Sequence, residues 1–302
     1  MLRTYVRYNL TRRRLQDTAT VILNNRKAGG KMSPPSNASA PKVHEVAVKG
    51  FDSEPVAYES SRPSYPEDAV DCLEEHLGLR SGESAVLDLG AGSGKFTRLL
   101  ASKNYHLTAV EPSPSMRATF ADILPNVPIL DGTAFAIPLE SASQDAVIVA
   151  QAFHWFAQIE TLREIHRVLK PGGRLGLVWN LEDRAAKKWV ASLRDVYEMY
   201  EMGTPQYRLG LWKKVWQTAE AEELFSKLED AHFEHETLCT EDLVWGRVCS
   251  KSYVACQSDE VKARLREQVL AILKSADDLE RDPSGLIKYP YKTDVYWCTK
   301  KS

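Results

Sequence analysis

Two hydrophobic periodicities alternate along residues 67–180. Short apolar runs, typical of buried parallel strands, are separated by segments whose apolar residues recur every three or four positions, as on one face of a helix. Strands are predicted at Ala85–Leu89, Leu107–Val110, Val127–Leu130, Gln144–Ala150 and Arg174–Asn180. Helices are predicted at Glu67–Leu79, Lys95–Leu100 and Ile159–Leu169. This alternation of strand and helix predicts an α/β fold with a doubly wound, mostly parallel sheet.

The rhythm changes after Asn180. Residues 183–228 are helical in composition, with tryptophans and tyrosines interleaved among charges. Glu234–Val248 and Pro290–Thr299 alternate like strands, and we expect them to close the sheet as an antiparallel pair, which brings the strands to seven. Between them, Asp259–Leu279 has the pattern of an amphipathic helix that covers a face of the sheet.

A glycine-rich turn follows the first strand. Its pattern is Asp88-x-Gly90-x-Gly92-x-Gly94, and the helix begins at once after it. Strand, glycine turn and helix bring backbone N–H groups and a positive helix end close to a ligand. Dinucleotide binding requires G-x-G-x-x-G, whose last glycine here is replaced by Lys95. The pattern present resembles motif I of the class I S-adenosylmethionine-dependent methyltransferases, which have a Rossmann-like fold.

That resemblance implies cofactor contacts beyond Asp88, Gly90 and Gly92. Glu111 ends the second strand about 20 residues after the turn, where such folds bind ribose hydroxyls. After the third strand, Thr133 stands where the family usually has an aspartate facing the adenine amino group, and the backbone of Ala134 is a further adenine contact. Met116 either packs on the adenine or belongs to the core.

A segment ahead of the first helix carries a second resemblance. Phe51–Pro66 contains Tyr-x3-Arg-Pro-x-Tyr-Pro, which resembles small-molecule methyltransferases related to trans-aconitate methyltransferase. The resemblance implies that Tyr58 and Arg62 contact the methionine end of the cofactor, since an arginine pairs bidentately with a carboxylate. The alternative is that Arg62-Pro63 only shapes the start of the next helix.

An aromatic cluster follows the fourth strand. Gln151-Ala-Phe-His-Trp-Phe156 lies at a carboxyl end of the sheet, where ligands of open α/β folds bind, and a His-Trp-Phe motif of this kind occurs in the same relatives. We expect Phe153 and Phe156 in the core, Gln151 at the cofactor and Trp155 at the substrate. His154 is the candidate general base for a hydroxyl, amine or thiol acceptor. A carboxylate acceptor needs no base.

The resemblance gives the expected organisation. Residues 48–302 form the methyltransferase domain, with 183–228 as a helical cap over the substrate, and residues 1–47 form a disordered or targeting segment. The expected activity is methyl transfer from S-adenosylmethionine to a small organic molecule, with a carboxylate as one candidate acceptor. Helix packing explains the aromatic residues of 183–228 equally well.

Charge and composition restrict the partners. A net charge of −2 disfavours nucleic acid, and five scattered cysteines without a CxxC pair indicate free thiols and no structural zinc site. No run approaches the roughly 18 apolar residues of a membrane-spanning helix. Residues 1–31 are rich in arginine and contain one acid, Asp17. They read as a mitochondrial transit peptide, a basic tail, or sequence upstream of an initiating Met32. We expect a cytoplasmic protein, or a matrix protein if the segment is a transit peptide.

Three other functions remain open from sequence. A nucleotide-dependent oxidoreductase is disfavoured by Lys95. A methyltransferase of nucleic acid is disfavoured because no Asn/Asp-Pro-Pro-Tyr/Phe signature follows the fourth strand. A non-catalytic cofactor-binding or scaffold protein with the same fold is the third.

Overall fold

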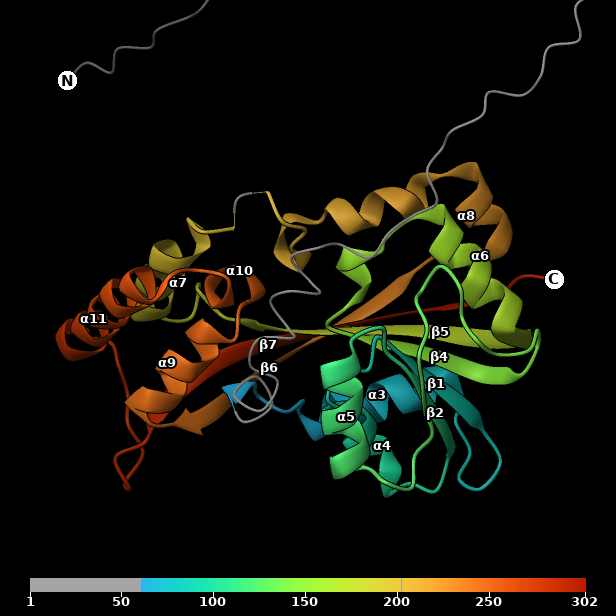
Figure 1. The fold of residues 1–302 in the computed structure, drawn as a ribbon, viewed down its shortest axis with the longest axis horizontal. Helices are drawn as coiled ribbons and strands as arrows, with labels where there is room; N and C mark the ends of the chain where they lie inside the picture. The colour runs from blue at the N-terminus through green and yellow to red at the C-terminus, as the bar shows by residue number, and fades with distance from the viewer. Residues whose placement is uncertain (1–60, 202) are drawn as a thin grey trace, which may run out of the picture. The chain divides into compact units, whose positions relative to one another are not determined.

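A mixed seven-stranded sheet organises the part of the chain that the computed structural model describes, residues 61–201 and 203–302. The strand order is β3-β2-β1-β4-β5-β7-β6 (Figure 1). The strands are β1 (Ala85–Leu89), β2 (His106–Val110), β3 (Ile129–Leu130), β4 (Gln144–Ala150), β5 (Leu169–Glu182), β6 (Glu229–Cys239) and β7 (Ile287–Thr299). Tyr58 and the N-terminal segment 1–47 lie outside the described residues.

The predicted strand directions are confirmed. Strands β1, β2, β3, β4 and β5 pair in parallel, and β7 runs antiparallel to both β5 and β6. Successive side chains of β1 point to opposite faces, so Val86 joins one hydrophobic cluster and Leu87 the other. Because both faces are buried, the parallel strands read in the sequence as continuous apolar runs.

Helices cover both faces of the sheet. Apolar side chains of α3 (Glu67–Leu77) and Leu100 of α4 (Thr97–Ala101) pack on one face. The other face is covered by α6 (Ile159–Val168), α8 (Ala219–Leu224) and the short 3-10 helix η3 (Leu211–Gln217). The remaining helix of this part, α5 (Pro114–Ile123), packs beside β3. The turn after β1 therefore opens between helix layers at the carboxyl edge of the sheet.

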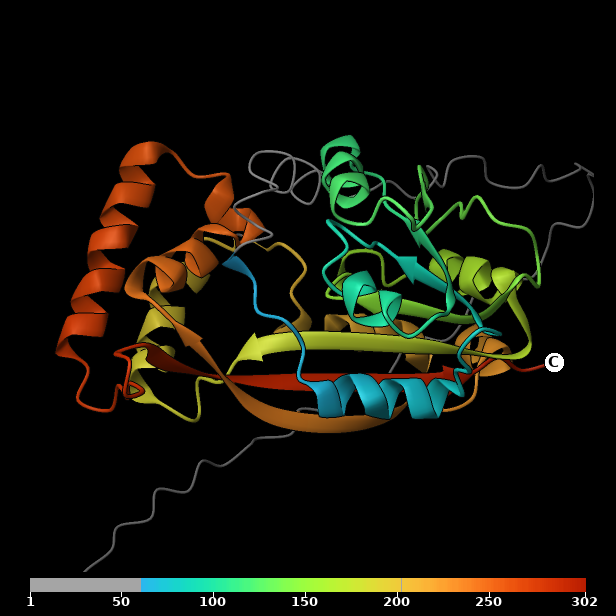
Figure 2. The ribbon, with the colours of Figure 1, turned by 90° about the horizontal axis from the view of Figure 1, so that it is seen from below.

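A further group of helices lies beyond the carboxyl ends of the parallel strands (Figure 2). It consists of α7 (Lys188–Glu198), α9 (Glu241–Cys249), α10 (Ser252–Ala255) and α11 (Asp259–Ser275). These helices share a hydrophobic cluster with Tyr289 and Tyr291 of β7. The segment 183–228 thus divides, because α7 belongs to this group while η3 and α8 lie on the sheet.

Two sequence predictions in the C-terminal third are wrong. The strand predicted at Glu234–Val248 ends at Cys239, and α9 follows it. Thr240 caps this helix by accepting a hydrogen bond from the N–H of Leu243 at 3.2 Å, and acidic residues fill the first turn. Helix α11 packs mainly against α7 and α9 instead of covering the sheet. None of the helices in the described ranges has the length and apolar character needed to cross a membrane.

Candidate active site

The glycine turn after β1 is held tightly against β2. The N–H groups of Gly90 and Ala91 both donate to the carbonyl of Val110, at 2.8 and 3.2 Å. Gly90 has φ of +74°, and a Cβ there would lie 3.0 Å from the Cβ of Ala152. Glycine is therefore required, because any side chain would be strained and would push into the loop that follows β4.

Glu111, at the end of β2, braces the same turn. Its Oε2 accepts a hydrogen bond from the N–H of Gly92 at 3.0 Å, and its Oε1 accepts one from the N–H of Ser113 at 2.9 Å. Each carboxylate oxygen can accept two hydrogen bonds. The backbone thus fixes the orientation of this carboxylate beside the turn.

Asp88 lies beneath the turn instead of facing a cavity. It is 1% exposed, and its Oδ2 accepts a hydrogen bond from the hydroxyl of Thr97 at 2.6 Å. Among the described residues its Oδ1 has no hydrogen-bond partner. Burial, followed by the nearby charge of Glu111, raises the pKa of Asp88 to about 7. Asp88 therefore supports the glycine turn from below and does not line a cavity.

Three adjoining cavities follow the carboxyl edge of the sheet. The first, the apolar cavity, is lined by Leu89, Gly90, Val110, Pro112, Gly132, Thr133, Ala134, Phe135, Trp155 and Phe156. The second, the turn cavity, is lined by Arg62, Pro63, Tyr65, Gly90, Ala91, Gly92, Ser93, Lys95, Phe96, Ala150, Gln151, Asn180, Glu182, Arg247 and Tyr291. The third, the charged cavity, is lined by Arg62, Gln151, His154, Trp155, Asn180, Leu181, Glu182, Tyr197, Glu198, Glu201, Gln206, Tyr207, Arg208, Lys251, Ser252 and Tyr253.

Shared residues join these cavities. Gly90 lines both the apolar and the turn cavity, and Trp155 lines both the apolar and the charged cavity. Arg62 and Gln151 separate the turn cavity from the charged cavity and line both. Arg62 also donates to the carbonyl of Ser250 at 2.8 Å, which ties it to the loop between α9 and α10.

The sequence-predicted residues fall into two groups. Arg62, Gly90, Gly92, Thr133, Ala134, Gln151, His154 and Trp155 line the cavities. Asp88 lies below them, and Met116 is 2% exposed within the core. Phe153 is fully buried as expected, but Phe156 lines the apolar cavity instead of belonging to the core alone.

Gln151 has an uncommon backbone conformation at the end of β4. Its φ is +58°, a value that non-glycine residues rarely adopt, and its N–H donates to the carbonyl of Val178 at 2.8 Å. Its side-chain Nε2 donates to the carbonyl of Asn180 at 2.9 Å. Backbone strain of this kind persists only where the surrounding structure holds the residue in place, and it is most frequent at ligand-binding sites. In this conformation Gln151 lines both the turn cavity and the charged cavity.

His154 lies in the 3-10 helix η1 (Phe153–Trp155) and is held in one tautomer. The indole Nε1–H of Trp179 on β5 donates to His154 Nδ1 at 3.1 Å. An indole nitrogen only donates, so Nδ1 is the acceptor and the proton of the neutral ring resides on Nε2. Burial, and then the positive charge of Arg62, lowers the pKa of His154 to about 3. The imidazole is thus a neutral hydrogen-bond donor, and this geometry does not fit the general base considered from the sequence.

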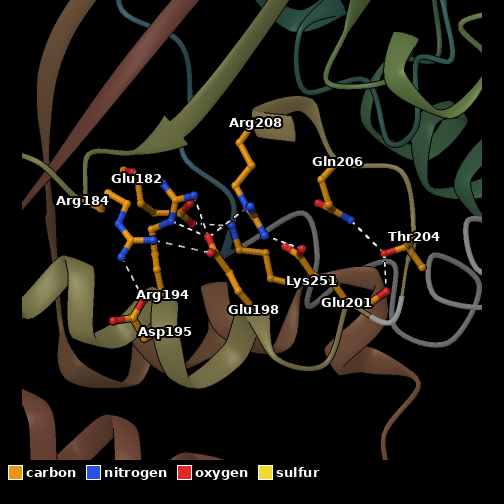
Figure 3. Close-up of polar contacts among 10 residues, drawn as sticks. All are labelled: Glu182, Arg184, Arg194, Asp195, Glu198, Glu201, Thr204, Gln206, Arg208 and Lys251. Atoms are coloured by element: carbon orange, nitrogen blue, oxygen red, sulfur yellow. Dashed lines mark hydrogen bonds and ion pairs between the residues drawn. The ribbon is translucent and has the colours of Figure 1, made fainter. Parts of the chain in front are cut away.

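Ion pairs form much of the wall of the charged cavity (Figure 3). Lys251 Nζ donates to Glu182 Oε1 at 2.5 Å. Glu198 accepts from the buried Arg194 at 2.6 Å and pairs with Arg208 at 3.1 Å, and Arg208 also pairs with Glu201. Every carboxylate of this wall therefore has a cationic partner. The same contacts give Lys251 one carboxylate partner and Arg208 two.

Known proteins are similar to this chain in sequence. A family model for a methyltransferase domain matches residues 87–177. A methyltransferase-like protein of Schizosaccharomyces pombe is 33% identical over 86% of this chain and 98% of its own length. A methyltransferase of Mycobacterium tuberculosis is 35% identical over 78% of this chain and 90% of its own length. The chain belongs to the methyltransferase family.

Solved structures agree on the fold of this methyltransferase. A methyltransferase structure from Anaeromyxobacter dehalogenans has a TM-score of 0.58 at 22% identity and covers 78% of this chain and 97% of that one. YcgJ of Bacillus subtilis has a TM-score of 0.51 at 19% identity, covering 78% of this chain and all of that one. The protein is an enzyme that uses S-adenosylmethionine.

The residues present fit that cofactor. A Cβ at Gly90 would disturb the surface of the glycine turn, and the N–H of Gly92 fixes the carboxylate of Glu111 beside that turn. The apolar cavity suits an adenine ring, and Arg62 in the turn cavity suits a carboxylate. Within residues 61–201 and 203–302, no group of three or more His, Cys, Asp or Glu side chains could hold a metal ion.

Sequence reasoning missed most of the charged cavity of the methyltransferase. Arg208 and Glu201 lie in the segment treated as a cap, where their charges gave no sign of pairing. Lys251 follows the segment misread as a strand. Asn180 and Glu182 lie at the carboxyl end of β5, and Gln151 follows the carboxyl end of β4. Ligands of open α/β sheets bind at the carboxyl ends of strands, so this position is the one sequence signal that could have found Asn180 and Glu182.

Proposed function

We propose that this enzyme transfers a methyl group from S-adenosylmethionine to a carboxylate oxygen of a small organic acid. The single observation that carries the proposal is the composition of the charged cavity. Its lining includes the neutral donor His154 and the ammonium of Lys251, which has one carboxylate partner, and each of its carboxylates is held by a cation and is not placed as a base. Donors without a base suit an acceptor that is already an anion.

The cofactor residues that line a cavity are assigned by it, and Glu111, which lines none of the three, is assigned by its contact with the turn and by the sequence resemblance. Thr133 and Ala134 lie beside the adenine, Glu111 accepts from the ribose hydroxyls, and Gly90 and Gly92 form the floor below the ribose. Arg62 binds the carboxylate of the methionine end, and Gln151 lies between donor and acceptor. Asp88 supports the turn from beneath. Tyr58 remains assigned to the methionine end by the sequence resemblance alone.

The reaction needs positioning more than acid–base chemistry. When bound, S-adenosylmethionine supplies a methyl carbon already activated by its sulfonium. A carboxylate oxygen of the acceptor forms the new bond to that carbon while the carbon–sulfur bond breaks and its electron pair goes to sulfur. The products are a methyl ester and S-adenosylhomocysteine, and no proton is released. Holding the oxygen in line at about 3–3.5 Å from the carbon contributes most of the rate.

His154 and Trp155 position the acceptor. The Nε2–H of His154 donates to the acceptor carboxylate, and Trp179 keeps that proton on Nε2. Trp155 lies between the adenine and the acceptor, with its ring centroid 5.3 Å from that of His154. Aromatic faces also stabilise a sulfonium by roughly 0.5–2 kcal/mol per contact.

The chemical stability of the product tests this proposal. The purified enzyme is incubated with methyl-labelled S-adenosylmethionine and succinate, glutarate or citrate, with the matching amides as controls. We expect label in a product that releases methanol on mild alkaline treatment, and none from the amides. Label that stays in an alkali-stable product would show transfer to nitrogen, sulfur, carbon or a hydroxyl oxygen and would overturn the carboxylate assignment.

A further inference from the structure

Lys251 is a nearly buried ammonium group in the charged cavity. Its side chain is 11% exposed, it directly precedes α10, and its Nζ lies 5.3 Å from the centroid of the Tyr197 ring. It forms a 2.5 Å hydrogen bond with Glu182 Oε1. An ammonium has three N–H donors, and the described residues provide an acceptor for one of them. A buried donor left without an acceptor is costly, so the cavity is suited to a ligand that supplies more.

Neighbouring groups fix the position of this amine. Glu182, which ends β5, is 4% exposed. Burial raises the pKa of its carboxyl group, but the positive charges of Lys251 and Arg62 outweigh this effect and lower the pKa to about 2. Arg194 donates to the backbone carbonyl of Glu182 at 2.9 Å, which holds the strand end in place. Lys251 is thus a rigid cation, unlike a mobile surface lysine.

Arg208 lines the same cavity but comes from a different segment of the chain. It lies in the 3-10 helix η2 (Tyr207–Leu209), and Figure 3 shows its guanidinium extending toward the region where Lys251 and Glu198 meet. Arg208 is shared by two carboxylates, Glu198 and Glu201. Both of its anionic partners therefore compete with any ligand, whereas Lys251 has one partner. Lys251 is the better placed of the two cations to accept a ligand anion.

We propose that Lys251 is the specificity-determining residue that binds the acceptor's carboxylate, with Glu182 as its permanent counter-ion. The inference rests on the proposed function, because it assumes a carboxylate acceptor in the charged cavity. Acids are selected over neutral analogues because an amide or an ester lacks the charge that the ammonium recognises. The role of Lys251 is binding, so it governs the affinity for the acceptor more than the methyl-transfer step.

The test compares two variants with the wild type. Lys251→Met removes the charge and keeps the length of the side chain, and Lys251→Arg keeps the charge. We expect Lys251→Met to raise the KM for the acid about 10- to 100-fold while kcat changes less than about threefold, and Lys251→Arg to recover part of the loss. Calorimetry with S-adenosylhomocysteine is expected to give the same affinity for all three proteins.

Two controls separate binding from stability. Lys251→Met leaves Glu182 buried without its partner, which destabilises the fold, so the double variant Lys251→Met with Glu182→Gln removes both charges. It should fold like the wild type and show the same rise in KM. Lys187→Met removes a lysine from a surface ion pair with Glu280, away from the cavities, and should leave KM unchanged.

The outcomes distinguish this inference from the proposed function. If the wild type methylates an acid and the double variant keeps the wild-type KM, the role of Lys251 is wrong and carboxylate methylation stands. If the wild type binds S-adenosylhomocysteine but neither binds nor methylates any of succinate, glutarate and citrate, the carboxylate acceptor fails, and the inference fails with it.

Discussion

The indole Nε1–H of Trp179 donates to Nδ1 of His154 at 3.1 Å, and this one contact decides what the histidine can do. The lone pair that a general base would use is occupied, and the only proton of the ring resides on Nε2. Trp179 is itself fully buried and stacks on Tyr207 at 4.4 Å between ring centroids, so the contact is held rigidly.

The first prediction follows from this tautomer. His154→Ala should lower kcat/KM for the acid about 10- to 100-fold, because one hydrogen bond to a charged group is lost. Since burial lowers the pKa of His154 to about 3, the imidazole is neutral throughout the working range, and the loss should be equal at pH 6 and pH 8. Nitrogen NMR of the wild type should show an unprotonated Nδ1.

Trp179→Phe is the matched variant for His154. It keeps an aromatic ring in the stack but removes the N–H, so the proton redistributes between the two ring nitrogens and kcat/KM falls by a smaller factor. A loss at pH 8 that disappears at pH 6 in His154→Ala would identify a base and contradict the donor role.

The second prediction concerns Glu111. Glu111→Ala should weaken S-adenosylhomocysteine binding by about 100-fold or more, because charge-assisted hydrogen bonds contribute about 1.5–3 kcal/mol each. Part of this loss comes from the turn, since Gly92 and Ser113 lose their acceptor. Glu111→Gln keeps one carbonyl acceptor and should lose less. Calorimetry measures both, and wild-type affinity in Glu111→Ala would exclude the ribose assignment.

The third prediction concerns the glycine turn. Gly94 has φ of +84°, and a Cβ there would lie 2.8 Å from a ring carbon of Phe120 and 2.9 Å from Leu124. Gly94→Ala should therefore lower the free energy of unfolding by about 2–4 kcal/mol, through backbone strain and overpacking together. Gly285 has a similar φ of +88° with no atom within 4 Å of its Cβ position, so Gly285→Ala isolates the backbone cost.

Denaturant unfolding of both variants gives the comparison. Gly285→Ala should lose about 1–2 kcal/mol. Equal losses in the two variants would show that α5 does not pack against the turn as described.

The fourth prediction is a pH dependence of acceptor binding. Burial lowers the pKa of Lys251 to about 8, against the partly compensating charge of Glu182. The charged groups that face it are Glu182 on β5, Arg62 ahead of α3 and Arg194 on α7, of which the two arginines disfavour its protonation. Binding of an anion requires the protonated amine, so affinity is complete below pH 7 and is lost as the pH rises through 8.

Calorimetry of the acid with the S-adenosylhomocysteine complex at pH 6.5 and pH 9 tests this. The dissociation constant should rise about tenfold in the wild type, the effect of roughly one pH unit above the pKa. Lys251→Arg should abolish the dependence, because arginine stays protonated. A wild-type affinity independent of pH would mean that another group binds the acid.

The parallel half of the fold was predictable because its signals are local. Ala85–Leu89 and Gln144–Ala150 are strands as predicted, since a run of apolar residues buried on both faces has one simple explanation. The contact between Glu111 and the glycine turn brings together two features that the sequence marks by their spacing and by the resemblance to motif I. Thr240 illustrates the opposite case: the residues after it alternate like a strand, but the helix cap formed by its hydroxyl overrides that pattern.

The charged cavity could not be predicted in the same way. Lys251 and Glu182 are 69 residues apart, and Arg62 and Ser250 are 188 apart. Each residue looks like an ordinary surface charge or polar group until the chain brings the pair together. His154 lines the charged cavity, and its tautomer depends on Trp179, which the sequence indicates only as a core residue of a strand.

One measurement tests the central claim most directly. The enzyme is given an acid whose carboxylate oxygens are both oxygen-18, and the product is treated with alkali in ordinary water. Because ester hydrolysis breaks the bond between the acyl carbon and the ester oxygen, methanol carrying oxygen-18 is predicted if the methyl group was transferred to a carboxylate oxygen. Methylated product that yields no heavy methanol would contradict the account.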